Sequence, residues 1–329
     1  MQTILVTGAT GKTGGACASY LLSSGSVKVQ CLVRDCSSAA ALKLAECGAE
    51  LVEGQFGETS SLVSACAKVD AAFLVCSNHL DQVELETAFI EAAASSNSVR
   101  YIVKVSTCGC ADYCTADSPV EYGRMHAQIE ANLAAAQKDL AWTVIRPNYF
   151  FQNHAGDIFG TLPAKLLTYP RSLTTLETGK ARTVDTRDVG EVAAKLLLLE
   201  CSTRTPGLGA WDAPEAASHA VSHYSQVYDV CGPTAWSVRG LAALYEEKLS
   251  LPSGAIRTPA LTEEKAAAGL EQAGFPPWLA RAVTIGNARY WAKELCDYPS
   301  SPAVLAIHPT FRTFEAWVDE HVPMVSFAE

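Results

Sequence analysis

The sequence predicts an α/β protein: a doubly wound parallel sheet of the Rossmann type, with a smaller and mostly helical C-terminal cap. Short apolar runs alternate with helical patterns through the first half of the chain. A Gly-x-x-Gly-x-x-Gly turn joins the first apolar run to the first helical pattern, and the alternation stops after Pro147. We expect residues 1–150, completed by residues 180–200, to form the core. Residues 151–179 and 201–329 should form the cap.

The strands of the core are expected at residues 4–6, 27–33, 49–53, 71–76, 101–105 and 142–145. Helices should follow the glycine turn and span residues 60–68, 81–95 and 120–137. Strands that are continuous runs of Val, Ile and Leu imply a parallel sheet covered on both faces. Right-handed crossovers between such strands produce the doubly wound order.

After Pro147 the pattern is less regular, and residues 150–169 are aromatic without a clear period. We expect a short strand and turn at residues 183–188, a helix at 189–199, a mobile connection at 206–222 and a strand at 226–230. Later helices should begin near Ser237, Glu263, Pro277 and Thr313.

Composition excludes several classes of partner. The chain has 329 residues and a formal net charge of −10, without a run of Lys or Arg. This argues against nucleic acid and against an anionic membrane surface. No apolar run reaches the length of a membrane span, and the first strand begins too early for a signal peptide. We therefore expect a cytoplasmic protein that acts on a small molecule, with a homodimer as a possible assembly.

The 12 cysteines are scattered through strand and helix patterns, as expected for small buried residues in a reducing compartment. Three of them, Cys108, Cys110 and Cys114, lie close together in a Cys-x-Cys-x-x-x-Cys pattern. This spacing matches no established zinc pattern, and no second pair is placed to complete it. The sequence therefore predicts no metal site.

The glycine turn predicts a bound dinucleotide. Gly8 would permit the tight turn, Gly11 would let the backbone approach the pyrophosphate, and Gly14 would let the helix lie close to the strand. The alternative is an ordinary glycine-rich turn between a strand and a helix. Its place directly after a strand and before a helix favours the dinucleotide.

Arg34 favours NADP over NAD. It follows the second strand, where an NAD enzyme usually has an acidic residue, and a guanidinium can bind a 2′-phosphate through two hydrogen bonds. Lys12 would add a second positive charge, although both cations could simply be solvated and Asp35 lies beside Arg34. The other residues predicted to bind the cofactor are Thr10, Thr13, Phe56, Ser77, Asn78, Thr107, His126, Pro147, Asn148, Tyr149 and Phe150.

Several motifs together resemble the NmrA-like family of atypical short-chain dehydrogenases. They are the turn at residues 7–14, Arg146-Pro147 followed by Phe150 and Asn153, and the segment 185–188 before a helix, with residues 231–233 and 309–314 extending the likeness. The resemblance implies the Rossmann fold and NADP. The family includes NADP-dependent quinone reductases, isoflavone-type reductases and fungal ergot-alkaloid reductases, and also NADP-sensing regulators without catalysis. The resemblance therefore does not decide the activity.

Tyr122, His126 and Ser106 are the predicted catalytic residues. Short-chain dehydrogenases use a Tyr-x-x-x-Lys pair in which the tyrosine gives a proton, and here His126 stands in place of the lysine. Residues four apart share a helix face, so Tyr122 and His126 should point the same way. For each of the two, the alternative role is placement of the cofactor. Ser106 and Thr107 end a strand, and there the alternative is a bond to the backbone.

A weak proton donor suggests an acceptor that needs little acid. An iminium carbon already attracts hydride and yields a neutral amine, whereas a simple ketone requires a proton. The sequence therefore favours an imine, an iminium or a conjugated carbonyl in a hydrophobic, polycyclic molecule, and the resemblance implies secondary metabolism. Aromatic residues that could line the substrate pocket or belong to the core are Tyr149, Phe150, Phe151, Trp211, Trp278, Tyr290 and Trp291. The competing hypothesis is an NADP-sensing regulator that docks to a protein.

Overall fold

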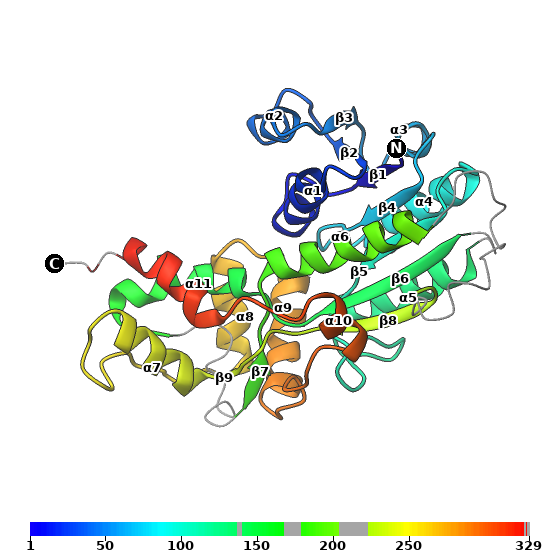
Figure 1. Cartoon of the computed structure of the whole chain (residues 1–329). Coiled ribbons are helices and arrows are strands. Elements are labelled where there is room, and N and C mark those ends of the chain that lie inside the picture. The colour runs from blue at the N-terminus through cyan, green and yellow to red at the C-terminus, as the bar shows by residue number, and fades with distance from the viewer. Residues whose placement is uncertain (137–139, 168–178, 204–222, 326, 328–329) are drawn as a thin grey trace. The chain divides into compact units, whose positions relative to one another are not determined.

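The computed structural model describes residues 1–136, 140–167, 179–203, 223–325 and 327 (Figure 1). It divides into two compact units. The first contains Met1–Ser106, Gln128–Arg146 and Thr186–Tyr228, and the second contains Thr107–Ala127, Pro147–Asp185 and Asp229–Glu329. Across the described residues, no helix has both the length and the apolar character that crossing a membrane requires.

A seven-stranded sheet organises the first unit. Its order is β3-β2-β1-β4-β5-β6-β8, the doubly wound order that the sequence predicts. The strands are β1 (Thr3–Val6), β2 (Lys28–Val33), β3 (Glu50–Glu53), β4 (Ala71–Leu74), β5 (Tyr101–Val105), β6 (Ala141–Pro147) and β8 (Gln226–Val230). The neighbours from β3 to β6 are all parallel. The direction of winding changes between β1 and β4, where sheets of this kind bind their ligands.

Helices cover the sheet, as its apolar strands require. They are α1 (Lys12–Ser24), α2 (Ala39–Glu46), α3 (Thr59–Cys66), α4 (Gln82–Ser95), α5 (Glu121–Ala135) and α6 (Thr186–Thr203). On one face, α3, α4 and α5 bury a core that includes Leu5, Leu74, Phe89 and Ile102. On the other face, α1 and α6 lie side by side, and α6 also contacts β4 and β5 (Figure 1).

The second unit is mostly helical and has its own aromatic core. Phe151, Tyr245, Tyr290, Phe314 and Trp317 are among its buried side chains. Its elements are η1 (Phe151–His154), η2 (Asp157–Thr161), η3 (Leu162–Ala164), β7 (Lys180–Arg182), β9 (Ala235–Ser237), α7 (Val238–Lys248), α8 (Glu263–Gln272), α9 (Pro277–Gly286), η5 (Asn287–Trp291), α10 (Pro302–Ile307), α11 (Phe314–His321) and η6 (Val322–Met324). Strands β7 and β9 form a small antiparallel pair.

The helix starts expected in this unit follow from capping. The side chains of Ser237, Thr262 and Thr313 each accept a backbone N–H in the first turn of α7, α8 and α11. Pro277 occupies the first position of α9, where its missing N–H has no consequence. All four predicted starts agree with the structure.

Two expectations need correction. The short strand predicted at residues 183–188 lies at β7, three residues earlier, because β9 supplies its partner there; from Thr186 onward the chain is helix α6. Residues 151–164, expected to be irregular, form three short helical turns, and an isolated parallel bridge joins Phe150 to Val184. The connection predicted at 206–222, with Trp211, lies outside the described residues.

Candidate functional site

The glycine turn is joined to the neighbouring strand by Thr7. Its hydroxyl accepts the Val75 N–H at 2.9 Å and lies 3.1 Å from the carbonyl oxygen of Phe73. Gly8 follows with a φ of +58°, which favours glycine. A Cβ on Gly14 would lie only 2.2 Å from the Gly8 carbonyl oxygen. The sequence thus needs glycine at both positions to bring α1 close to the end of β1.

The N-terminus of α1 has the chemistry of an anion site. Gly11 is its N-cap residue, and no side chain among the described residues caps the helix there. The first turn contains no acidic residue, and Lys12 at its start is exposed. Backbone N–H groups and the helix dipole at such an end attract phosphate. Since Gly14 lets α1 begin close to Gly8, these N–H groups lie at the glycine turn, where they suit a dinucleotide pyrophosphate.

Arg34 lies exposed directly after β2, and its acidic neighbour is occupied elsewhere. The Asp35 carboxylate accepts the Ser37 hydroxyl at 2.6 Å and the Ser37 N–H at 2.8 Å. These hydrogen bonds lower the pKa of Asp35 below its usual value. Asp35 therefore holds its own turn, which leaves the Arg34 guanidinium as the group that can contact a ribose phosphate.

The positions of the remaining cofactor candidates of the first unit do not by themselves indicate contact with a cofactor. Thr10, Ser77 and Asn78 are exposed in the segments that follow β1 and β4, and Thr13 is buried in the first turn of α1. Phe56 is half-buried, with its ring centroid 5.9 Å from that of Phe89. Packing on the core therefore explains Phe56 at least as well as contact with a cofactor does.

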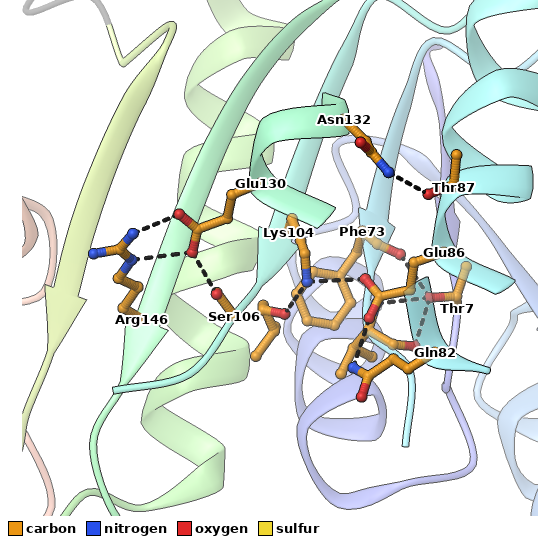
Figure 2. Close-up of polar contacts among 12 residues, drawn as sticks. Thr7, Phe73, Gln82, Glu86, Thr87, Lys104, Ser106, Glu130, Asn132 and Arg146 are labelled. Atoms are coloured by element: carbon orange, nitrogen blue, oxygen red, sulfur yellow. Dashed lines mark hydrogen bonds and ion pairs between the residues drawn. The ribbon is translucent and has the colours of Figure 1, made fainter. Parts of the chain in front are cut away.

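Sequence reasoning missed a buried ion pair in the first unit. The Lys104 ammonium on β5 lies 2.9 Å from the Glu86 carboxylate on α4, and both side chains are 0% exposed (Figure 2). Lys104 also donates to the Val105 carbonyl at 2.8 Å, and the Gln82 amide donates to Glu86 at 2.8 Å. The available signal was a lysine inside an otherwise apolar strand, because such a residue needs a partner when it is buried.

Ser106 is held by a second charged pair. Glu130 on α5 accepts from both Nε and Nη2 of Arg146 on β6, and it also accepts the Ser106 hydroxyl (Figure 2). The hydroxyl proton of Ser106 is therefore directed toward Glu130. This geometry favours Ser106 as a residue that orients a ligand over Ser106 as the proton donor.

In the second unit, the hydroxyl of the half-buried Tyr122 shares a short hydrogen bond with that of Tyr113. Burial and the neighbouring Tyr122 raise the pKa of Tyr113, which therefore remains a neutral phenol that can donate. A Cβ on Gly123 would lie 2.1 Å from the Tyr113 carbonyl oxygen, so glycine is required for this approach. His126, one turn after Tyr122, is 5% exposed. Tyr113 lies in a loop, where no sequence pattern pointed to it.

The residues at and after the end of β6 pack and hydrogen-bond within the second unit. Pro147 and Asn148 are buried, and the Asn148 amide donates to the Cys296 carbonyl at 2.9 Å. The ring of the half-buried Tyr149 contacts Trp291, with 5.1 Å between centroids. Phe150 and Thr107 are half-buried, as is Trp278 on α9. Tyr290 and Trp291 are 2% exposed, so packing accounts for both of these rings.

Comparisons with known proteins find one matching family and several named reductases. The profile of the NmrA-like family matches residues 1–205. The NAD(P)H azoreductase of Xenophilus azovorans is 29% identical over 287 residues, which cover 85% of this chain and 84% of that protein. The (4-alkanoyl-5-oxo-2,5-dihydrofuran-3-yl)methyl phosphate reductase of Streptomyces griseus is 28% identical over 318 residues, 97% of each chain.

Among solved structures, the NADPH-dependent quinone oxidoreductase of Escherichia coli, complexed with NADPH, superposes with a TM-score of 0.75. The sequence identity is 21%, and the match covers 96% of this chain and 99% of that one. At this identity the superposition demonstrates a shared fold.

Proposed function

The chain belongs to the NmrA-like family, and on that basis we propose that it is a reductase that delivers hydride from NADPH to a flat, hydrophobic, conjugated small molecule. The observation that carries this proposal is the turn at the N-terminus of α1. Gly8 and Gly14 let α1 begin close to the end of β1, which places the N–H groups of its first turn beside the glycine turn, and that first turn has no acidic side chain to oppose a phosphate.

The names of the relatives support the class of acceptor. An azo compound, a quinone and a dihydrofuranone with an alkanoyl group are all conjugated and poor in electrons. Such molecules accept hydride at an electrophilic atom, and the negative charge that develops is spread over the conjugated system. An iminium carbon also accepts hydride, and its product is a neutral amine, so no negative charge develops. The proposed substrates are therefore conjugated carbonyl or iminium compounds, and a simple ketone is a poor candidate.

Residues of the first unit would hold the cofactor. The backbone N–H groups at the start of α1 would bind the pyrophosphate, and Arg34 with Lys12 would bind the 2′-phosphate that distinguishes NADPH from NADH. When bound, NADPH supplies the hydride. Glu130 orients Ser106, and we assign Ser106 to positioning a ligand and not to proton transfer.

Tyr122 would supply the proton where the product needs one. Tyr113 is a buried phenol beside it, and a hydrogen bond donated by Tyr113 would stabilise the Tyr122 oxygen after the proton has left. We assign Tyr122 as the general acid and Tyr113 as the residue that positions it and supports its charge. His126 shares the helix with Tyr122, and we assign it to placement of the nicotinamide ribose.

The test compares two acceptors in the Tyr122→Phe variant. With a conjugated carbonyl whose reduction needs a proton, turnover should fall by roughly 10²- to 10⁴-fold, the usual contribution of a general acid. With an iminium acceptor, turnover should stay within a few-fold of the wild-type value, because no proton is added. The matched control is Tyr20→Phe, because Tyr20 lies in the C-terminal half of α1, away from the glycine turn. Equal losses with both acceptors would show that Tyr122 acts on the fold or the cofactor instead.

A further inference from the structure

Three thiols from distant parts of the chain meet inside the second unit. The Cys108 and Cys110 sulfur atoms lie 3.3 Å apart, and the Cys296 sulfur lies 3.6 Å from that of Cys110. All three sulfur atoms lie within 4.8 Å of one another. The side chains are 6–7% exposed, and all three cysteines are reduced. The fold therefore brings Cys296 to the pair formed by Cys108 and Cys110.

The main chain holds this group in place. Cys108 and Cys110 flank Gly109, whose N–H donates to the Tyr298 hydroxyl at 3.2 Å. The Cys296 carbonyl accepts from the Arg182 N–H at 3.0 Å and from the Asn148 amide at 2.9 Å. These hydrogen bonds hold the backbone on both sides of the cluster and do not involve the thiols. The sulfur atoms therefore lie close together because of the backbone, and contacts between the thiols are not required for it.

The distances suit a metal ion that prefers sulfur. Zinc binds thiolate at about 2.3 Å, so sulfur ligands at tetrahedral corners lie about 3.8 Å apart. The two separations, 3.3 and 3.6 Å, are somewhat shorter than that value, so a bound ion would need only a small outward movement of the thiols. The Tyr298 hydroxyl oxygen lies 3.2 Å from the Cys108 sulfur.

The three thiols alter one another's pKa. Hydrogen bonds with the Cys110 and Cys296 thiols hold the pKa of Cys108 well below its usual value, despite burial. The same contacts raise the pKa of Cys110 and Cys296. A bound cation would have to displace the protons of the thiols that it binds.

We propose that Cys108, Cys110 and Cys296 form a site for one thiophilic metal ion, with Zn²⁺ as the expected occupant. This proposal departs from the expectation of no metal site drawn from sequence spacing. It does not depend on the proposed function, because its test requires no turnover and no NADPH.

The experiment uses the full chain, purified under reducing conditions and incubated with Zn²⁺ or Co²⁺ before excess metal is removed. Elemental analysis should find about one Zn²⁺ per chain, and the Co²⁺ form should show a thiolate-to-cobalt charge-transfer band. Cys296→Ala should lose both signals. Cys114→Ala, which removes a buried cysteine of the same segment outside the cluster, should keep both.

The wild-type chain alone can overturn the proposal. Less than about a tenth of an ion per chain, together with no charge-transfer band, would mean that the thiols only pack together. Equal metal content in Cys296→Ala and wild type would mean that the ion binds elsewhere. If Cys296→Ala fails to fold, Cys110→Ser supplies the same comparison, and the wild-type cobalt spectrum still decides the outcome. A Cys110–Cys296 disulfide in protein isolated without oxidant would also contradict a metal site.

Discussion

Gly14→Ala tests the turn on which cofactor binding depends. The added Cβ would lie 2.2 Å from the Gly8 carbonyl oxygen, 2.5 Å from the Gly8 carbonyl carbon and 2.9 Å from the Thr7 carbonyl oxygen. All three atoms belong to the backbone, so no side-chain rotation relieves the contact. Since Cβ atoms rarely approach other atoms closer than 3.0 Å, the start of α1 must move away by roughly 0.8 Å.

That movement has two measurable effects. Forcing a methyl group into a packed interior costs about 1–3 kcal/mol of unfolding free energy. Moving the helix N-terminus away should remove at least one charge-assisted hydrogen bond to phosphate. The binding free energy lost is about 1.5–3 kcal/mol, which raises the Kd for NADPH roughly 10- to 150-fold. Urea unfolding measures the first effect, and fluorescence titration with NADPH measures the second.

Gly57→Ala is the matched control. A Cβ at residue 57 would meet nothing within 4 Å, and the residue lies in the same unit. This variant should keep the stability and the NADPH Kd of the wild type. If Gly14→Ala bound NADPH as tightly as Gly57→Ala does, α1 would not hold the pyrophosphate, and the reasoning from its N-terminus would be wrong.

Three further predictions concern single groups. Arg34→Ala should weaken NADPH binding by about 1.5–3 kcal/mol and leave NADH binding nearly unchanged, and equal losses in the two titrations would exclude contact with the 2′-phosphate. Tyr113→Phe should lower kcat roughly 10-fold on an acceptor that needs a proton and leave KM unchanged, since only support of the Tyr122 charge is lost; an unchanged kcat, measured by steady-state kinetics, would remove Tyr113 from the mechanism. Lys104→Met should lower the unfolding free energy by about 3–5 kcal/mol because Glu86 is left buried without its cation, and the double variant K104M/E86Q should recover part of it in urea unfolding; no recovery would contradict the pairing.

Features that depend on neighbouring residues could be predicted from the sequence. The strands from β1 to β6, the glycine turn and the first residue of α9 follow from apolar runs, glycine spacing and a proline. The strand order followed because right-handed crossovers leave few alternatives. The misplaced strand at residues 183–188 illustrates the limit, since β7 exists where β9 can pair with it.

Contacts between distant segments could not be predicted. Lys104 in an apolar strand indicated that a buried partner must exist. That the partner is Glu86 depends on how α4 packs over β5. Tyr113 lies in a loop without a period, and Cys296 is 186 residues from Cys110. Such contacts depend on tertiary packing, of which a single sequence carries no local record. The possible homodimer, the cytoplasmic location and the role in secondary metabolism stay predictions.

Transfer of deuterium from NADPH tests the central claim most directly. The measurement uses NADPH deuterated at one or the other C4 position, a conjugated acceptor that takes hydride on carbon, and mass spectrometry of the product. We predict one deuterium in each product molecule from one of the two labelled cofactors and none from the other. NADPH that binds without any consumption across carbonyl, quinone, azo and iminium acceptors would contradict a reductase and indicate a protein that senses NADP.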